Sequence, residues 1–208
     1  MPFESVQLSA ETRKDQETKV QDLWLFITKI KQLSKHVEEV RRLSLRLFDE
    51  LFAYHGCGIE ERYFLECAAI IHDCGHAIAQ KKHHKHSMRL IMEAKLPTFT
   101  PREKLVIANI ARYHRKNTPK PTHLEFMRLT PADQETVRKM AALLRIADSL
   151  IRADGNRVNH IDISVTDEQC HFTIFSNNPC VEEIESFSKR KDLFINTFGR
   201  DALLTKKD

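Results

Sequence analysis

The chain has 208 residues, of which 41% are hydrophobic and 30% charged, so it can bury a substantial core as one domain or as one domain with an appendage. Its formal net charge of +4 suits an anionic substrate and is too weak to indicate nucleic-acid binding. The apolar runs are too short to span a membrane, and the N-terminus has no hydrophobic signal core, which favours a cytoplasmic protein without membrane contact.

The first third of the chain is expected to be mostly helical. Residues 1–19 are polar and lack an apolar period, which predicts a tail or a marginal helix. From Val20 to about Tyr54, apolar residues recur every three or four positions and predict a helix, which the stretch His55-Gly56-Cys57-Gly58 ends. The five cysteines lack CxxC spacing and indicate reduced, structural thiols.

Helical patterns continue through the middle of the chain. The threonine-proline pairs at Thr100 and Thr130 each look like an N-cap followed by proline in the first turn. The predicted helices run from Glu60 to about Ile71, with a break near Gly75, from His86 to Ala94, from Thr100 to about His114 and from Thr130 to about Arg152.

The character of the sequence changes at Gly155. Alternating apolar residues on both sides of Asp167-Glu168 predict a short β-hairpin. A last helix, carrying Val181 to Phe198 on its apolar face, is expected to pack on it. The fold class is therefore mainly α, with a polar segment over residues 1–19, a helical domain over 20–155 and a hairpin with a helix over 156–208.

Ionisable residues fall on faces of these helices that should be buried. They are His36, His72 with its neighbour Asp73, His114 and Asp148. Each has an ordinary explanation by itself: a core histidine with a backbone partner, an aspartate that caps a turn, or a carboxylate paired with Arg145 or Arg152.

A single site explains all of these residues together. Charged groups on core faces are costly unless they are paired or bound to a metal. Imidazole and carboxylate groups that converge from separate helices are typical ligands of divalent metal ions. The pattern therefore predicts a metal site formed by one or two divalent ions.

The order His36, His72-Asp73, Asp148 on successive helices resembles the HD superfamily of metal-dependent phosphohydrolases. The surrounding stretches AAIIHDCGHAIAQKKHHKHSMRLI, ANIARYHRK, AALLRIADSLIRADGNRV and DLFINTFG resemble the C-terminal HD-like region of the exopolyphosphatase/guanosine pentaphosphate phosphatase (Ppx/GppA) family. Full-length members of that family hold their phosphatase site in an N-terminal actin-like domain. The sequence lacks the glycine-rich phosphate loops of such a domain, so only the HD-like fold and its site are expected here.

The resemblance implies further ligands. Two-metal HD hydrolases, such as those resembling diadenosine tetraphosphate hydrolases, place two more histidines between the HD pair and the last aspartate. His83, followed four residues later by Ser87, and His114 in Tyr113-His114 match these positions. His84 and His86 compete with His83, and a histidine-rich run can also be a solvated loop. His76 stands where some HD proteins have a lysine, and it could donate to a phosphate oxygen or transfer a proton.

This ligand set indicates the chemistry. Asp73 would bridge two ions, which activate water for attack on phosphorus. Arg115 and Lys116, and then Lys85, are the candidates to stabilise charge on phosphoryl oxygens, although they could also form a solvated basic loop. Mixed nitrogen and oxygen ligands favour manganese, iron, zinc or cobalt over magnesium.

The expected function is metal-dependent hydrolysis of a small phosphate-bearing substrate, such as a nucleotide or a polyphosphate-like phosphoester or phosphoanhydride. Two alternatives remain open. The chain could be a non-catalytic module that binds an anion or a nucleotide. It could also be an interaction protein, in which the charged N-terminal segment and the histidine-rich run dock a partner or support a homodimer.

Overall fold

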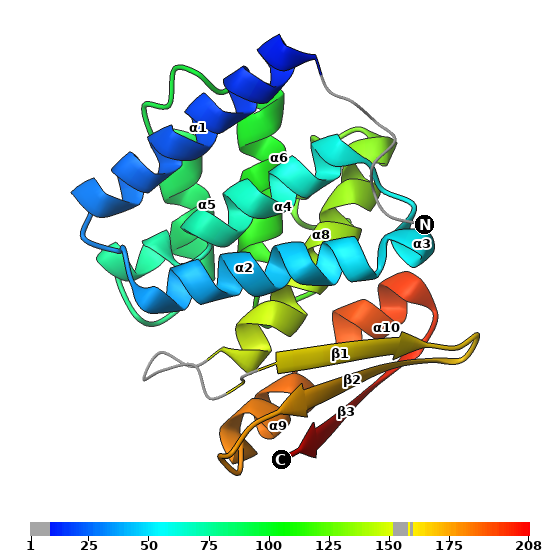
Figure 1. Ribbon diagram of the computed structural model, residues 1–208. Coiled ribbons are helices and arrows are strands. Elements are labelled where there is room, and N and C mark those ends of the chain that lie inside the picture. The colour runs from blue at the N-terminus through cyan, green and yellow to red at the C-terminus, as the bar shows by residue number, and fades with distance from the viewer. Residues whose placement is uncertain (1–8, 152–157, 159) are drawn as a thin grey trace.

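The computed structural model describes residues 9–151, 158 and 160–208 (Figure 1). The helices that precede the sheet in sequence form the upper part of Figure 1, and a small sheet with two helices lies below them. The upper helices are α1 (Ala10–Lys29), α2 (Lys35–Glu50), α3 (Phe52–His55), α4 (Ile59–Ile71), η1 (Cys74–Ala77, a 3₁₀ turn), α5 (His83–Glu93), α6 (Pro101–Arg112), α7 (Leu124–Met127) and α8 (Pro131–Leu150). The lower part contains β1 (His160–Val165), β2 (Gln169–Phe175), α9 (Val181–Ser188), α10 (Asp192–Phe198) and β3 (Asp201–Lys207).

Helix α8 is the central element of the fold. It packs against α2, α4 and α6 in the helical part and against α9 and α10 in the lower part. Every side chain from Met140 to Leu150 is buried, including those of Arg145 and Asp148. Because buried charged groups are costly without partners, both residues must find ion pairs or polar contacts inside the fold.

The predicted helix starts at the two threonine-proline pairs are confirmed. The Thr100 hydroxyl accepts a hydrogen bond from the Glu103 amide, and the Glu103 carboxylate accepts one from the Thr100 amide at 2.7 Å, which is a capping box. Thr130 caps α8 by accepting from the amide of Asp133 at 3.1 Å. These caps fix the N-terminal ends of α6 and α8. His114 and Asp148 lie near the opposite, C-terminal ends of the same helices.

Of the two alternatives predicted for residues 1–19, the helix is the one found from Ala10 onward, but the boundary needs correction. Helix α1 begins at Ala10, so the predicted boundary between residues 19 and 20 lies inside it. Its polar residues are ordered by specific contacts, because the buried ammonium of Lys19 lies 2.9 Å from Glu103 on α6. The single helix predicted from Val20 to Tyr54 is interrupted after Lys29, and Ser34 caps the new helix α2.

Two further boundaries differ from the prediction. Helix α5 begins at His83, three residues earlier than expected, so it includes the histidine-rich run. The last predicted helix is divided into α9 and α10, separated by the residues that include Arg190. The boundary predicted at Gly155 lies outside the described residues.

The predicted hairpin is confirmed, but it belongs to a three-stranded sheet. Strands β1 and β2 pair antiparallel, with Ile161 opposite Ile174. Strand β3, which was missed, pairs parallel to β2, with Cys170 opposite Ala202. Phe172 of β2 contacts the rings of Phe187 and Phe194, so one face of the sheet packs on α9 and α10. The fold class, mainly α with strands near the C-terminus, is confirmed.

The turn after α4 brings two segments of the chain unusually close together. A Cβ atom on Gly75 would lie 2.1 Å from the carbonyl oxygen of His83 and 2.4 Å from the amide of Ser87. The Ser87 hydroxyl accepts a hydrogen bond from the Gly75 amide at 2.9 Å and donates one to the carbonyl of His72 at 2.6 Å. Glycine at 75 and a small polar residue at 87 therefore hold α5 against the end of α4.

We expect Gly75→Ala to lower the free energy of unfolding by about 2–3 kcal/mol, because the added methyl group overlaps backbone atoms that cannot move independently. Urea unfolding of the metal-free protein, followed by circular dichroism, measures the change. Gly58→Ser is the matched control, since a Cβ there would meet only the Glu61 carboxylate at 3.4 Å and serine is a favoured N-cap. Equal unfolding midpoints for the two variants would contradict this account.

Candidate metal centre

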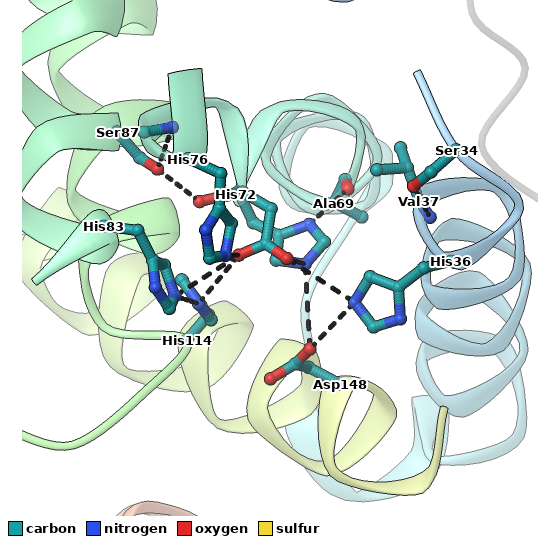
Figure 2. A network of polar contacts seen from close by, with 12 residues as sticks. Ser34, His36, Val37, Ala69, His72, His76, His83, Ser87, His114 and Asp148 are labelled. Carbon is teal, nitrogen blue, oxygen red and sulfur yellow. Dashed lines mark hydrogen bonds and ion pairs between the residues drawn. The ribbon is translucent and has the colours of Figure 1, made fainter. Parts of the chain in front are cut away.

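Histidines and aspartates from separate helices point toward one another in a single cluster (Figure 2). Most of them lie at or just beyond helix ends, so that several helices can each contribute a side chain to one place. His36 lies in the first turn of α2 and Asp148 in the last turn of α8. The others are His72 and Asp73 after α4, His76 in η1, His83 at the start of α5 and His114 just after α6.

One group of ligand atoms lies on the Oδ2 side of Asp73. This oxygen is 3.6 Å from Nε2 of His36 and 3.5 Å from Nε2 of His72. Oδ1 of Asp148 lies 3.2 Å and 3.7 Å from the same two nitrogens. These four residues could together hold a metal ion.

A second group lies on the Oδ1 side of Asp73. The Nε2 atoms of His76, His83 and His114 lie 3.6, 3.4 and 3.5 Å from that oxygen. The Nε2 atoms of His83 and His114 are 3.2 Å apart. Asp73, His76 and His83 could also hold an ion. Asp73 is therefore shared by both groups, one oxygen to each.

The backbone fixes the tautomer of three of these imidazoles. Nδ1 lies 2.8 Å from the carbonyl of Ala69 in His72, 3.1 Å from that of Gln80 in His83 and 2.5 Å from that of Ala111 in His114. A carbonyl only accepts hydrogen bonds, so each Nδ1 must carry the proton. Whenever such a ring is neutral, the lone pair is on Nε2, which faces the centre. Such backbone contacts are the usual outer support of metal-binding histidines.

Burial keeps two imidazoles of the second group uncharged, those of His83 and His114. It lowers the pKa of His114 to about 3, with a further contribution from the charge of His72. Burial also lowers the pKa of His83, in spite of the nearby Asp73. Both rings are therefore neutral at pH 7, and their Nε2 lone pairs face each other across 3.2 Å. This arrangement is repulsive unless a cation lies between them.

The first group has the opposite electrostatics. Burial disfavours the charged form of His72, but Asp73 and Asp148 outweigh it and raise the pKa of His72 to about 9. Burial alone would raise the pKa of Asp148, yet Arg190, His36 and His72 hold it well below its usual range. The buried carboxylates thus require positive charge beside them, which a proton on His72 or a metal ion can provide.

The spacing of the donor atoms fits bound ions. Two nitrogens that bind one ion at about 2.1 Å lie about 3.0–3.4 Å apart for angles between a right angle and the tetrahedral value. The separation of 3.2 Å between His83 and His114 falls in this range. In addition, Nε2 of His72 is buried and faces carboxylate oxygens of Asp73 and Asp148 at 3.5 and 3.7 Å, which is longer than a hydrogen bond. The residues present therefore fit metal ions in both groups.

The partner of Asp148 is a residue that sequence reasoning missed. The Nη1 group of Arg190, between α9 and α10, forms an ion pair with Oδ2 of Asp148. The sequence suggested Arg145 or Arg152 as this partner. Arg145 instead donates to the Lys116 carbonyl at 2.6 Å and lies 3.2 Å from Asp192. Arg152 is outside the described residues. Nothing in the local pattern around Arg190 could have indicated this contact, because 42 positions separate the two residues.

The remaining predicted residues lie around the centre. His84 is buried with its ring edge-on to that of His83, at 5.9 Å between centroids, but it belongs to neither ligand group, and neither does His86. Of the three histidines in this run, the structure therefore brings His83 to the centre. Arg115 and Lys116 line a pocket together with Arg190. The ring of His76 stacks on that of His83, with 4.0 Å between the ring centroids. His76 therefore lies beside the ligands, whereas the sequence suggested only a contact with substrate.

The fold and this cluster define a mainly helical protein with histidine and aspartate groups that could hold metal ions. The sequence profile of the family described as Ppx/GppA phosphatase, domain III, matches residues 28–189, which is most of the chain. The chain belongs to this family, which confirms the resemblance to the C-terminal region of Ppx/GppA proteins and relates the chain to polyphosphate and nucleotide phosphatases. No protein with a curated description matches it. None of the described helices combines the length and apolarity needed to cross a membrane.

We expect the two ligand groups to lose metal independently. Purified protein reconstituted with manganese should hold about two equivalents per chain. His36→Gln and His114→Gln should each retain about one equivalent, because each change affects one group, whereas Asp73→Asn should lose both. Elemental analysis after gel filtration measures the content, and His86→Gln is the matched control. Full occupancy in Asp73→Asn would show that this carboxylate does not bridge the groups.

The buried neutral histidines should make the metal-free protein acid-sensitive. Between about pH 6.5 and 3, His114 is neutral when folded and protonated when unfolded. The unfolded state then binds more protons, so stability falls with decreasing pH by up to about 1.4 kcal/mol per unit for each such group. His72 affects stability in a different pH range. Its folded-state pKa of about 9 lies above the ordinary 6.5, so the stability that its proton contributes is lost as the pH rises from 6.5 to about 9.

Urea unfolding at several pH values in the presence of a chelator tests this expectation. His114→Gln should show a shallower loss of stability between pH 6.5 and 4.5 than the wild type. The variant His160→Gln, at an exposed position, should keep the wild-type slope. Parallel curves for the wild type and His114→Gln would contradict the assignment of a buried neutral ring.

Proposed function

We propose that this chain is a metal-dependent phosphohydrolase of the HD type with two ions. The observation that carries the proposal is the division of ligands around Asp73, whose two oxygens face two separate sets of imidazoles. A structural site needs one closed set of ligands. Two adjoining sets that share a carboxylate are the arrangement used to clamp both the attacking and the leaving oxygen of a phosphoryl group.

The proposed ligands are assigned by group. His36, His72, Asp73 and Asp148 would hold the first ion. Asp73, His83 and His114 would hold the second, on the basis of their distances, and His76, which also lies within reach of that ion, is assigned to proton transfer instead. Mixed imidazole and carboxylate donors favour manganese, iron, zinc or cobalt. Ions of this kind make water a nucleophile near neutral pH and offset charge on phosphoryl oxygens.

The side chains around the ligands would bind and orient the substrate. Arg115 and Lys116 follow His114 directly, line a pocket and would neutralise phosphoryl oxygens, while Lys85 lies on the exposed face of α5. The side chain of His76 is 23% exposed, compared with 4% for His83 and 1% for His114. The ring of His76 is therefore the one that solvent and substrate can reach, which suits proton transfer to the leaving group.

The reaction is hydrolysis of a phosphoester or phosphoanhydride. The water oxygen forms a bond to phosphorus, the bond from phosphorus to the leaving oxygen breaks, and the leaving oxygen takes up a proton. The charge that develops on the phosphoryl oxygens lies next to the cationic side chains. An anion-binding module without turnover is less well supported, because it would use the basic residues but would have no need of the paired, oriented imidazoles.

We expect metal-loaded protein to hydrolyse a phosphoester or phosphoanhydride, and Asp73→Asn to lower kcat/KM by at least about a hundredfold. A panel of p-nitrophenyl phosphate, bis(p-nitrophenyl) phosphate and a nucleoside triphosphate, with manganese present, provides the assay. Asp49→Asn is the control, since Asp49 pairs with Arg62 on the surface. If Asp73→Asn retained turnover, the proposed mechanism would be wrong.

A second variant separates binding of metal from proton transfer. His76→Gln should keep its metal content and lose about a hundredfold in kcat, with a changed pH profile, if His76 transfers a proton. Loss of metal from this variant would instead assign His76 to the second ligand group.

A further inference from the structure

Charge is distributed unevenly along the chain, which its small net charge conceals. No carboxylate side chain lies between Asp73 and Glu93 or between Glu103 and Glu125. These two stretches hold nine of the 33 lysines and arginines. The rest of the chain, with the other 24 and all 29 aspartates and glutamates, is therefore net negative. The net charge of +4 is thus no guide to the surface that the two stretches form.

The two stretches are neighbours in the fold. Helix α5 from the first packs against α6 from the second (Figure 1). At the end of α6, Nη1 of Arg112 lies 3.6 Å from Sδ of Met88 on α5. The loop that follows returns to the same place, because Nδ1 of His123 lies 2.7 Å from the hydroxyl group of Tyr113. Cationic side chains from both stretches therefore lie close together.

Four cations from these elements lie toward the surface. Lys82 is the N-cap residue of α5, and Lys85 lies three positions further along. Arg112 ends α6, and Lys120 belongs to the loop before α7. The three lysines are exposed and Arg112 is half-buried. Together these four side chains form what we call the basic face.

The charges of the basic face are concentrated and lack partners in the protein. Burial lowers the pKa of His123, and the charges of Arg112, Lys120 and Lys85 lower it further, so these three cations lie around one ring. Among the ion pairs of the described residues, none involves a member of the basic face. Like charges gathered in this way repel one another, and an anion that binds along them offsets the repulsion.

A ring suited to stacking lies beside these cations. His123 is half-buried and stacks on the buried ring of Tyr113, with 5.6 Å between the centroids and 24° between the planes. Leu124, the next residue, is 80% exposed. In single-stranded nucleic acids the bases stack on such side chains while the phosphates follow cations. A membrane surface suits this face less well, because none of the exposed large apolar residues lies on α5.

We propose that the basic face binds a single strand of nucleic acid. Its four cations contact the phosphates of the strand, and His123 with Leu124 lies against the bases. Phosphate contacts supply much of the affinity of such complexes, and stacking makes them tolerant of sequence. The inference goes beyond the proposed function, because binding of the strand requires neither metal ions nor turnover.

The basic face borders the candidate metal centre. His83 follows Lys82 directly, and His114 comes two residues after Arg112. The side chain of Asp73 is 21% exposed, so the centre is open to solvent. A strand on the basic face therefore passes close to the ligands.

Fluorescence anisotropy with labelled single strands of RNA and DNA, each about a dozen nucleotides long, measures the binding. EDTA is present so that no strand is cleaved. For the wild type, the slope of log K against log salt concentration should be about −3, because each of four phosphate contacts contributes about −0.7. Lys85→Gln/Lys120→Gln should bind at least about tenfold more weakly at low salt, with a slope less steep by about 1.4.

The stacking ring gives a second, independent test. His123→Ala should weaken binding of the strand at least about fivefold without changing the salt slope, because a base contact is lost and the phosphate contacts remain. Its affinity for inorganic polyphosphate, which has phosphates but no bases, should stay unchanged. Measurements at pH 8 keep the ring of His123 neutral, since its pKa is lowered. His160→Ala, at an exposed position on β1, is the matched control.

A charge-matched variant excludes general electrostatic attraction. Lys14→Gln/Lys207→Gln removes the same formal charge from exposed lysines of α1 and β3 and should bind the strand like the wild type. Circular dichroism melting shows whether each variant is folded. The inference is overturned if neither strand binds, if the basic-face variant binds like this control, or if His123→Ala weakens polyphosphate as much as the strand. Strand binding by a protein that hydrolyses no phosphoester when loaded with metal would support this inference and refute the proposed function.

Discussion

The candidate metal centre depends on how the half-buried carboxylate of Asp73 is shared. Asp73 offers one oxygen to each of two sets of imidazoles, and neither set is complete without it. Backbone carbonyls hold the Nδ1 side of the rings of His72, His83 and His114, so the convergence of their Nε2 atoms is a property of the folded backbone. The close packing of Gly75 against α5 keeps these two parts of the chain in register.

Much of the fold could be predicted because its signals are local. Threonine caps followed by proline define helix starts, and the buried face of α8 around Asp148 follows from its apolar spacing. The predictions were wrong where contacts between residues distant in sequence determine the local structure. Lys19 is ordered by Glu103, 84 positions away. Strand β3, Asp201–Lys207, carries charges at both ends and becomes a strand only by pairing with β2.

The candidate site divides in the same way. His36, His72, Asp73 and Asp148 were recognisable because a charged group on a core face requires a partner, and the structure brings them together. Their metal-binding role stays a prediction. The choice of His83 over its neighbours depended on the helical phase of α5, which begins three residues earlier than expected. The ion pair of Arg190 had no local signal at all.

That ion pair has a consequence for the modularity of the fold. Asp148 lies between His36 and His72 on one side and an arginine supplied by the lower part on the other. If α9 and α10 were removed from α8, the buried carboxylate would lose a compensating cation, and the electrostatics of the whole centre would change. The helical part is thus not an autonomous module that could be transplanted with its chemistry intact. The sheet and its helices are a constituent of the centre, and any exchange of parts between relatives would have to keep both together.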